Sequence, residues 1–372
     1  MEQEVLCRLA LIQIPGIGDL FAKLLTEYFK GAKYLFTSSR KELALIPGVG
    51  TYLLGNLTST KIKNEVFLRA EQELRFTEKY NIKIILYDQL GYPEKLKGID
   101  DAPFILFYKG TDVLQTTKIL SLVGTRKATG YGEDVTRKIT EDLKDENILI
   151  VSGLAYGIDT FAHKFAIENE LPTLGVLAHG LDRIYPHKNK GLAEKMVENG
   201  GLLTEFFSGT NPDRENFPKR NRIVAGISDA TVVIEATVKG GALITARIAN
   251  SYSRDVLAVP GRTIDFYSKG CNWIIKNEQA ALIESGQDIL KALNWTEAPE
   301  VFENKNQLEL FLNLSNDEKA ILDVLKNNGT ANKERLAVQL NQKLSVLSGM
   351  LFNMEMNGII KALPGNNYQL KA

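Results

Sequence analysis

Short apolar runs alternate with amphipathic segments between residues 119 and 295. Between the runs, apolar residues recur at the spacing of one helix face, as in 131–143 and 160–169. Strands that helices cover on both faces are short and apolar, and their alternation with helices is typical of a doubly wound parallel sheet. The pattern therefore predicts an α/β domain over residues 80–295. The strands expected in it are residues 119–123, 148–151, 173–177, 202–205, 231–234 and 256–259.

The pattern changes on the N-terminal side of this region. Residues 82–87 and 104–108 are apolar runs of strand length, which we expect to flank or extend the sheet. Residues 1–75 are expected to form a small helical domain of helix-hairpin-helix or SAM-like type, because they carry a two-copy repeat, Ile14-Pro-Gly-Ile-Gly18 and Ile46-Pro-Gly-Val-Gly50. Glycine-rich hairpins of that type present backbone N–H groups to a phosphate. A tight turn between packed helices explains the same residues, so DNA contact and a purely structural role both stay open.

The C-terminal part of the chain follows a Glu- and Asn-rich stretch, residues 296–314, which we expect to be a linker. Ser315 is a candidate N-cap for the first of three expected helices, and a hairpin follows them, so residues 315–372 describe a winged helix. The third helix, residues 345–356, contains no Lys or Arg and one acid, Glu355. A helix that reads DNA needs cations or amides at the groove. We therefore expect this domain mainly to contact protein.

Whole-chain composition points to no particular partner. The 45 Lys and Arg residues balance 45 Asp and Glu residues, so a nucleic-acid surface has to come from local segregation of charge. Cys7 and Cys271 are far apart and the three histidines lack metal-ligand spacing, so we expect a cytoplasmic protein without disulfide, metal or cofactor. The acidic start and the absence of a long apolar run predict neither a signal peptide nor a membrane span.

Charge does segregate at residues 217–226, Phe-Pro-Lys-Arg-Asn-Arg-Ile-Val-Ala-Gly. Lys219, Arg220, Asn221 and Arg222 occupy consecutive positions at the start of an expected helix, and no acid interrupts them. The first turn of a helix has unpaired N–H groups and partial positive charge, and the forked donors of arginine match phosphate oxygens. The run predicts an anion site. A solvated helix start that makes surface ion pairs is the alternative.

Glycine-rich turns follow several of the expected strands, at the edge of a parallel sheet where ligands bind. They do not match the dinucleotide fingerprint, because their spacing differs from G-x-G-x-x-G and no acid follows the second strand. We expect Asp159 to cap the helix that follows. Together with the basic run, these turns predict a polyphosphate or nucleic-acid ligand. The turn residues expected to contact it are Gly124, Arg126, Ser152, Gly153, Gly180, Gly240 and Gly241.

In order and spacing, these motifs resemble those of the DNA-processing protein A (DprA, also called Smf) family over residues 80–290. Two positions depart mildly, since Thr125 and Gly240 stand where the family often has Ser. The resemblance implies an extended Rossmann domain that binds single-stranded DNA, forms homodimers and helps load the RecA recombinase during natural transformation. The matching motifs are Gly-Thr-Arg126, Ser-Gly-Leu-Ala-Tyr-Gly-Ile-Asp159, Tyr185-Pro186, Phe-Pro-Lys-Arg-Asn-Arg222, Gly-Gly-Ala-Leu-Ile-Thr-Ala246 and Val259-Pro-Gly261.

Carried over by motif, the resemblance implies a DNA groove in which glycine turns supply close backbone approach. Bases are expected to stack on a nearby ring such as Phe217 or Tyr185. The side chains implied to line the groove are Arg126, Lys219, Arg220, Asn221 and Arg222.

The fold also resembles nucleotide phosphoribohydrolases of the lysine-decarboxylase-like group, which carry a glutamate just after a Gly-Gly-x-Gly-Thr turn. The matching turn here continues Ala-Leu-Ile-Thr-Ala-Arg247 and has no carboxylate. We therefore expect a clamp that holds a DNA strand without cutting it. A nucleotide hydrolase that uses Glu235 is the alternative.

Overall fold

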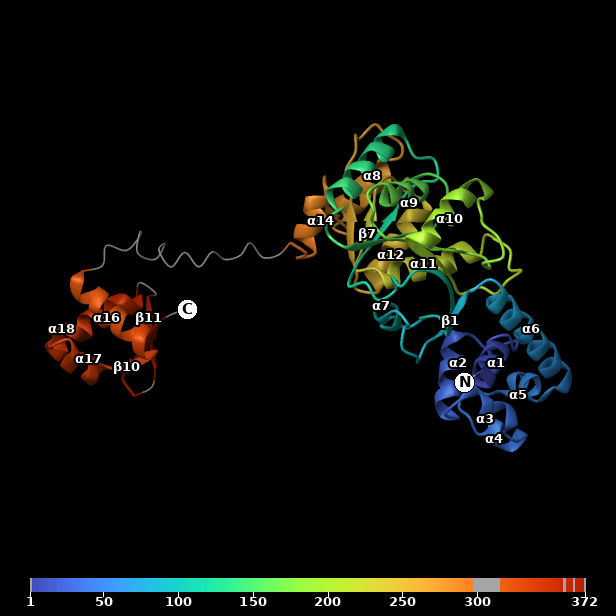
Figure 1. The fold of residues 1–372 in the computed structure, drawn as a ribbon, viewed down its shortest axis with the longest axis horizontal. Coiled ribbons are helices and arrows are strands. Elements are labelled where there is room, and N and C mark those ends of the chain that lie inside the picture. The colour runs from blue at the N-terminus through green and yellow to red at the C-terminus, as the bar shows by residue number, and fades with distance from the viewer. Residues whose placement is uncertain (1, 297–314, 357–358, 364, 371–372) are drawn as a thin grey trace. The chain divides into compact units, whose positions relative to one another are not determined.

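The computed structural model describes residues 2–296, 315–356, 359–363 and 365–370, apart from the side chains of residues 327 and 328. The chain divides into two compact units, Met1–Thr296 and Glu297–Ala372. Figure 1 labels the elements of both. The linker expected over residues 296–314 lies outside the described residues from position 297 onward.

A nine-stranded sheet, in the order β1-β2-β6-β5-β4-β3-β7-β8-β9, forms the centre of the described first unit. From β6 to β9 in that order the strands run parallel, whereas β2 and β1 extend the β6 edge in antiparallel fashion. The predicted α/β sheet is confirmed. Its strands are β1 Lys83–Leu86, β2 Ile105–Gly110, β3 Lys118–Val123, β4 Ile148–Ser152, β5 Thr173–Val176, β6 Gly200–Thr204, β7 Ala230–Val233, β8 Asp255–Ala258 and β9 Ala281–Leu282.

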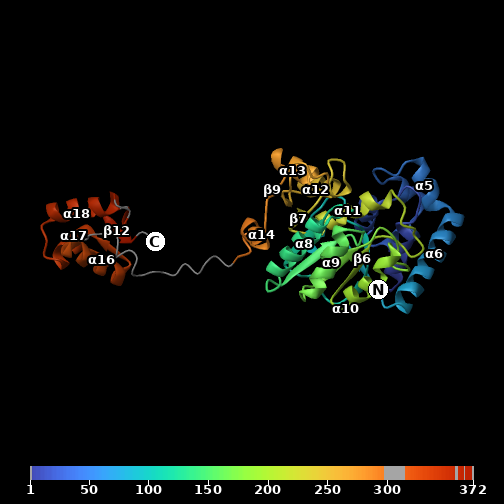
Figure 2. The same cartoon turned by 90° about the horizontal axis from the view of Figure 1, so that it is seen from above.

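Helices cover both faces of this sheet (Figure 2). Along β3, Ile119 and Val123 share a core with α11, α12 and α13, while Leu120 and Leu122 share another with α8, α9 and α14. Successive residues of a strand point to opposite faces, so a strand covered on both sides is apolar throughout. The helices of this region are α7 Glu94–Lys97, α8 Gly130–Asp142, α9 Ile158–Glu168, α10 Lys190–Glu198, α11 Asn216–Ile227, α12 Gly241–Ser251, α13 Lys269–Lys276 and α14 Gly286–Ala292, with a 3₁₀ turn at His187–Asn189.

The N-terminal residues are helical, as expected, and share a core with the antiparallel edge of the sheet. Leu9, Leu25 and Leu57 belong to the same buried cluster as Leu86 and Phe107 of the strands β1 and β2. This shared core places the helical part inside the first compact unit. Its helices are α1 Glu2–Leu11, α2 Asp19–Tyr28, α3 Ala32–Thr37, α4 Arg40–Ala44, α5 Thr51–Thr58 and α6 Thr60–Lys79.

The two glycine-rich hairpins of this part pack against each other. Gly16 and Gly48 have φ angles of +93° and +90°, which favour glycine. A Cβ atom on Gly16 would lie 3.4 Å from the ring of Tyr52, and one on Gly48 would lie 3.1 Å from the ring of Phe21. Tyr52, which follows the second hairpin, therefore packs against the first hairpin, and Phe21, which follows the first hairpin, packs against the second. This reciprocal packing supports the structural role of the repeat, and DNA contact by the hairpins stays a prediction.

The described part of the second unit has three helices and a three-stranded antiparallel sheet, in the order β10-β12-β11. This is the predicted winged helix, and Ser315 caps its first helix in a capping box with Glu318. Helix α18 buries Leu347, Leu351 and Met354 in the core of the unit. The elements are α16 Asn316–Asn328, β10 Thr330–Asn332, α17 Lys333–Gln339, α18 Leu344–Met356, β11 Ile360–Leu363 and β12 Asn367–Leu370. No helix in the described parts of either unit is both long and apolar enough to cross a bilayer.

Candidate nucleic-acid interface

The order of the parallel strands reverses at β3, since β4 lies on one side of it and β7 on the other. Ligands of such sheets bind at this switch point, beyond the carboxyl ends of the strands. A hollow of about 460 Å³ opens there. It is bordered by the turns after β3 and β4 and by the starts of α11 and α12. The predicted site residues that it brings together are Gly124, Arg126, Gly153, Phe217, Arg220, Asn221, Gly240 and Gly241.

The start of α12 offers backbone donors to this hollow. Its N-cap, Gly240, makes no side-chain cap, and its first turn contains no acid. Gly241 and Ala242 follow and also line the hollow. A helix start of this kind attracts an anion through its unpaired N–H groups and its partial positive charge.

The start of α8, by contrast, already holds an anion from the protein itself. Glu235, two residues after the end of β7, is 2% exposed and accepts the backbone N–H of Thr129 at 2.9 Å and its hydroxyl at 2.6 Å. A Cβ atom on Gly132 would lie 2.2 Å from a Glu235 carboxylate oxygen, so only glycine fits beside it. Dinucleotide-binding sheets place the pyrophosphate at this first βα turn. Here the carboxylate fills that position, and it is not available to attack a nucleotide.

Arg220 forms the floor of the hollow and holds the ends of two strands together. It is 4% exposed and donates to the carbonyl oxygens of Gly153, at 2.7 Å, and of Val176. Burial lowers its pKa to about 10, which still leaves the guanidinium charged at neutral pH. Burial raises the pKa of the neighbouring Asp159, and the charge of Arg220 opposes that rise.

Asp159 does not cap α9, so that prediction is wrong. The N-cap of α9 is Gly157, and Asp159 stands in the first turn. Its carboxylate reaches back to accept the N–H groups of Gly153, at 3.1 Å, and Ala155, at 3.3 Å. It therefore stabilises the turn after β4, because that turn needs acceptors for its buried amides. Among the described residues that line the hollow, Asp159 is the one acid, and these bonds occupy it.

An exposed cation and two rings lie close together: Arg126 and Phe217 line the hollow, and Tyr185 lines a smaller pocket that Arg126 and Phe217 also border. The guanidinium of Arg126 lies 4.7 Å from the ring centroid of Phe217, and the ring of Tyr185 lies 6.2 Å from Phe217 on a tilted plane. Arg126 is exposed, and Tyr185 is 45% exposed. A planar cation beside aromatic faces can bind a phosphate and stack bases at the same time.

A family model described as DNA recombination-mediator protein A matches residues 83–294. The chain is 33% identical to the DNA processing protein DprA of Bacillus subtilis over 298 residues, which cover 79% of this chain and 96% of that protein. It is 42% identical to DprA of Streptococcus pneumoniae over 200 residues, or 54% of this chain and 70% of that protein. This chain belongs to the DNA recombination-mediator protein A family.

Two solved DprA structures agree with this assignment. The X-ray structure of DprA from Streptococcus pneumoniae aligns with a TM-score of 0.63 at 29% identity, over 78% of this chain and 98% of that chain. A structure of the Helicobacter pylori protein, which describes its single-stranded DNA binding mode, aligns with a TM-score of 0.53 at 28% identity, over 58% of this chain and 96% of that chain.

In this DprA family member, Ser152 and Gly180 lie away from the ligand position that their motifs suggest. Ser152 is fully buried, and its hydroxyl donates to the carbonyl of Leu122 at 2.6 Å. A Cβ atom on Gly180 would lie 2.4 Å from the carbonyl oxygen of Phe207. Ser152 therefore ties β4 to β3, and the close approach at Gly180 serves the packing of two loops. Neither residue lines the hollow.

The four residues of the basic run do not all line the hollow, and DNA contact by Lys219 and Arg222 stays a prediction. Arg220 and Asn221 line the hollow, whereas Lys219 and Arg222 line a separate surface depression beside Tyr252. The physical reason is the helix itself, since consecutive residues are turned by about 100° and point to different sides. Four neighbouring positions in α11 thus point to more than one side of the helix.

Arg222 is occupied by partners within the protein. Its guanidinium pairs with Glu205 and, at 3.2 Å, with Asp19 of α2, and it also donates to the carbonyl of Asp101. Its side chain is 12% exposed. These bonds tie α11 to α2 of the N-terminal helices. Arg222 therefore stabilises the packing within the first unit.

Arg214, Thr237 and Thr245 also line the hollow and carry no sequence signal that marks them. Arg214 stands in a polar loop before the run, and Thr245 is buried inside α12. The fold alone brings them to the switch point.

Proposed function

We propose that this protein binds single-stranded DNA along the hollow at the switch point and holds it without cutting it. The observation that carries the proposal is the cluster of Arg126 and Phe217 at the hollow with Tyr185 beside Phe217. Phosphates would bind Arg126, Arg214 and the start of α12, and bases would stack on Phe217 or Tyr185. The single-stranded DNA binding mode described for the Helicobacter pylori relative supports the same ligand.

The more specific role that we propose is the one expected of the family. The bound strand is protected and passed to the RecA recombinase during DNA processing and natural transformation, by a homodimer in the cytoplasm. The description of the family as a recombination mediator supports this role. Both cysteines of the chain are free and buried, which suits a reducing compartment.

The winged helix contacts protein in this proposal. The exposed side of α18 presents Val346, Phe352 and Met356, which are 45%, 62% and 72% exposed. Apolar side chains and the lack of cations suit a protein partner better than a phosphate backbone.

The test of DNA binding is the substitution Arg126→Gln, measured as affinity for a labelled single-stranded oligonucleotide across a salt series. Loss of one charge-assisted phosphate contact is expected to weaken binding about tenfold and to reduce the salt slope by about 0.7. The effect should be the same for every base sequence, because the phosphate carries no sequence information.

The matched control is Arg75→Gln on α6, which removes the same charge from a side chain that is 80% exposed and has only a 4.0 Å ion pair with Glu71. It should leave affinity and slope unchanged. Equal effects of the two substitutions, or an unchanged affinity in Arg126→Gln, would argue against the proposed groove. Competition with duplex of the same length establishes the preference for single strands.

A further inference from the structure

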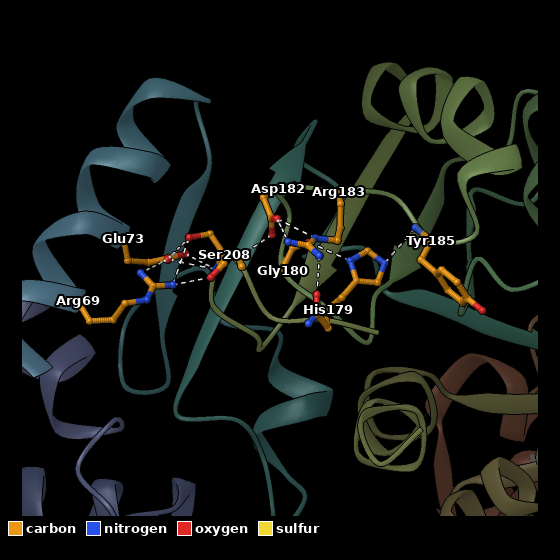
Figure 3. Close-up of polar contacts among 10 residues, drawn as sticks. Arg69, Glu73, His179, Gly180, Asp182, Arg183, Tyr185 and Ser208 are labelled. Atoms are coloured by element: carbon orange, nitrogen blue, oxygen red, sulfur yellow. Dashed lines mark hydrogen bonds and ion pairs between the residues drawn. The ribbon is translucent and has the colours of Figure 1, made fainter. Parts of the chain in front are cut away.

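Ser208 lies in the loop between β6 and α11, and two residues of α6 bind all of its polar groups (Figure 3). The carboxylate of Glu73 accepts the Ser208 N–H at 3.0 and 3.1 Å and the Ser208 hydroxyl at 2.6 Å. Arg69 donates to the Ser208 carbonyl and, at 3.2 Å, to the hydroxyl oxygen. Glu73 is 1% exposed, so these are buried, charge-assisted bonds.

The same two α6 residues also reinforce each other. Arg69 pairs with Glu73 at 2.8 Å, one helical turn away. The Arg69 guanidinium lies 5.3 Å from the ring centroid of Phe207, which itself packs edge-on against Phe107 of β2. The loop is thereby held to α6 through polar and aromatic contacts at adjacent residues.

Beyond Ser208, the loop is joined to a second loop, residues 179–185. Asp182 accepts the N–H of Gly209 at 2.8 Å, and the N–H of Gly180 donates to the carbonyl of Thr210 at 3.3 Å. Arg183 donates to the side-chain oxygen of Asn211 at 2.6 Å. Three successive residues of the first loop therefore fix the position of the second.

His179 links the start of the second loop to Tyr185 at its end. Its Nδ1 bonds the carbonyl of Gly180 at 2.9 Å, and its Nε2 accepts the N–H of Tyr185 at 3.3 Å. Because a carbonyl oxygen only accepts, the proton must sit on Nδ1. The ring is 1% exposed, so these are bonds of a buried side chain. Tyr185 lies beside Phe217, and the first loop leads into α11, whose second residue is Phe217.

We propose that Glu73 is a positioning residue for base stacking: by fixing Ser208, it holds the loop that carries Tyr185 in register with the loop that leads into Phe217 of α11. The inference rests on the proposed function, since stacking has meaning only if a strand binds here. It makes the N-terminal helices part of the DNA-binding apparatus without requiring that they touch DNA.

The test uses two strands of equal length and charge, one of thymidines and one of abasic sites, with the full chain. The wild type is expected to prefer the thymidine strand, because only bases stack. Glu73→Gln keeps the shape but turns an amide N–H₂ toward the donors of Ser208 or Arg69. We expect it to lose about tenfold in affinity for the thymidine strand, the scale of one stacked base. Affinity for the abasic strand and the salt slope should stay unchanged, because Arg126 and α12 are untouched.

Glu71→Gln is the matched control, since it makes the same change on the exposed side of α6. It should reproduce the wild-type ratio of the two affinities. Ser208→Ala removes the hydroxyl partner alone and should also lower the ratio of thymidine-strand to abasic-strand affinity. In the double variant with Glu73→Gln, the two effects should be less than additive, because both substitutions act through one contact. It also carries the test if Glu73→Gln does not fold.

Equal losses on both strands, or a wild-type ratio in Glu73→Gln and Ser208→Ala, would overturn the inference and leave the proposed function intact. A wild type that binds neither strand would overturn the proposed function, and this inference with it.

Discussion

Arg126 and Arg220 border the same hollow, but their surroundings give them different roles. The donors of Arg220 are used by two strand-end carbonyls and its charge faces Asp159, so it is part of the scaffold. Arg126 is exposed and lies over a ring. Arg126 can therefore contact a phosphate in the proposed function, while replacement of Arg220 would leave two buried strand-end carbonyls without this donor and Asp159 without its neighbouring positive charge.

His163 is a second residue whose surroundings set its chemistry. It is fully buried on α9, its Nδ1 bonds the hydroxyl of Thr173 at 2.7 Å, and its Nε2 has no partner. The Thr173 hydroxyl donates to the carbonyl of Ile150, so it accepts the Nδ1 proton. Burial lowers the pKa of His163 to about 3, helped by the charge of Arg220.

This shift predicts how stability depends on pH. Between about pH 6.5 and pH 3 the unfolded chain binds a proton at His163 that the folded chain does not, so the free energy of unfolding falls as the pH falls. Between pH 7 and pH 5, the free energy of unfolding of the wild type should fall by about 2 kcal/mol more than that of His163→Asn. Urea denaturation at the two pH values measures this. His187→Asn, the same change at an exposed ring, is the control. A difference between wild type and His163→Asn that stays constant with pH would contradict this account.

Helix α11 shows how one element serves two purposes. One side of it carries Phe217, Arg220 and Asn221 to the hollow. The other side carries Arg222 to two carboxylates, one of which, Asp19, belongs to α2. Burial raises the pKa of the second, Glu205, to about 7, although Arg222 opposes the rise. The pairing of Arg222 thus compensates a carboxylate that is costly to ionise.

Arg222→Met should therefore change stability more than DNA binding. It leaves Glu205 and Asp19 without their cation, and we expect a loss on the order of 3 kcal/mol in the free energy of unfolding. Lys219→Met, at the exposed neighbour on the same helix, should cost less than about 0.5 kcal/mol. Chemical denaturation measures both. A salt slope for DNA binding that falls in Arg222→Met, with stability unchanged, would instead assign Arg222 to phosphate contact.

At the scale of the whole molecule, the chain consists of two compact units, each with its own apolar core. The hollow, its cations and its rings all belong to the first unit. The second unit presents an apolar helix side without Lys or Arg. In the proposed function, DNA binding and protein contact therefore belong to different units.

This division predicts the result of truncation after Thr296. The first unit should fold and keep the single-strand and duplex affinities of the full chain, because α18 brings no cation to a groove. Binding of labelled single-stranded and duplex oligonucleotides to both forms measures this. Loss of most duplex affinity in the truncated form would show that the winged helix contacts DNA after all.

The hydrophobic periodicity of the sequence was enough to predict the fold, but not enough to predict which side chains line the candidate site. A strand that lies between two layers of helices must be apolar throughout. Each of the strands β3, β4, β5 and β7 could therefore be predicted from its own residues. The direction of a side chain at an element's end depends on what packs there. Ser152 is a strong ligand candidate by position, yet it bonds the neighbouring strand.

The amino-acid order alone therefore predicted the α/β sheet, the winged helix, the family motifs and the sheet edge at which the hollow lies, because local patterns encode these features. Only the tertiary structure decided which cations are free. Arg126 is exposed, Arg220 is buried among carbonyls, and Arg222 is paired across two helices. It also brought Glu73, 135 residues before Ser208 in the chain, to the loop that leads into Phe217. Such contacts join residues remote in sequence, and no local pattern records them.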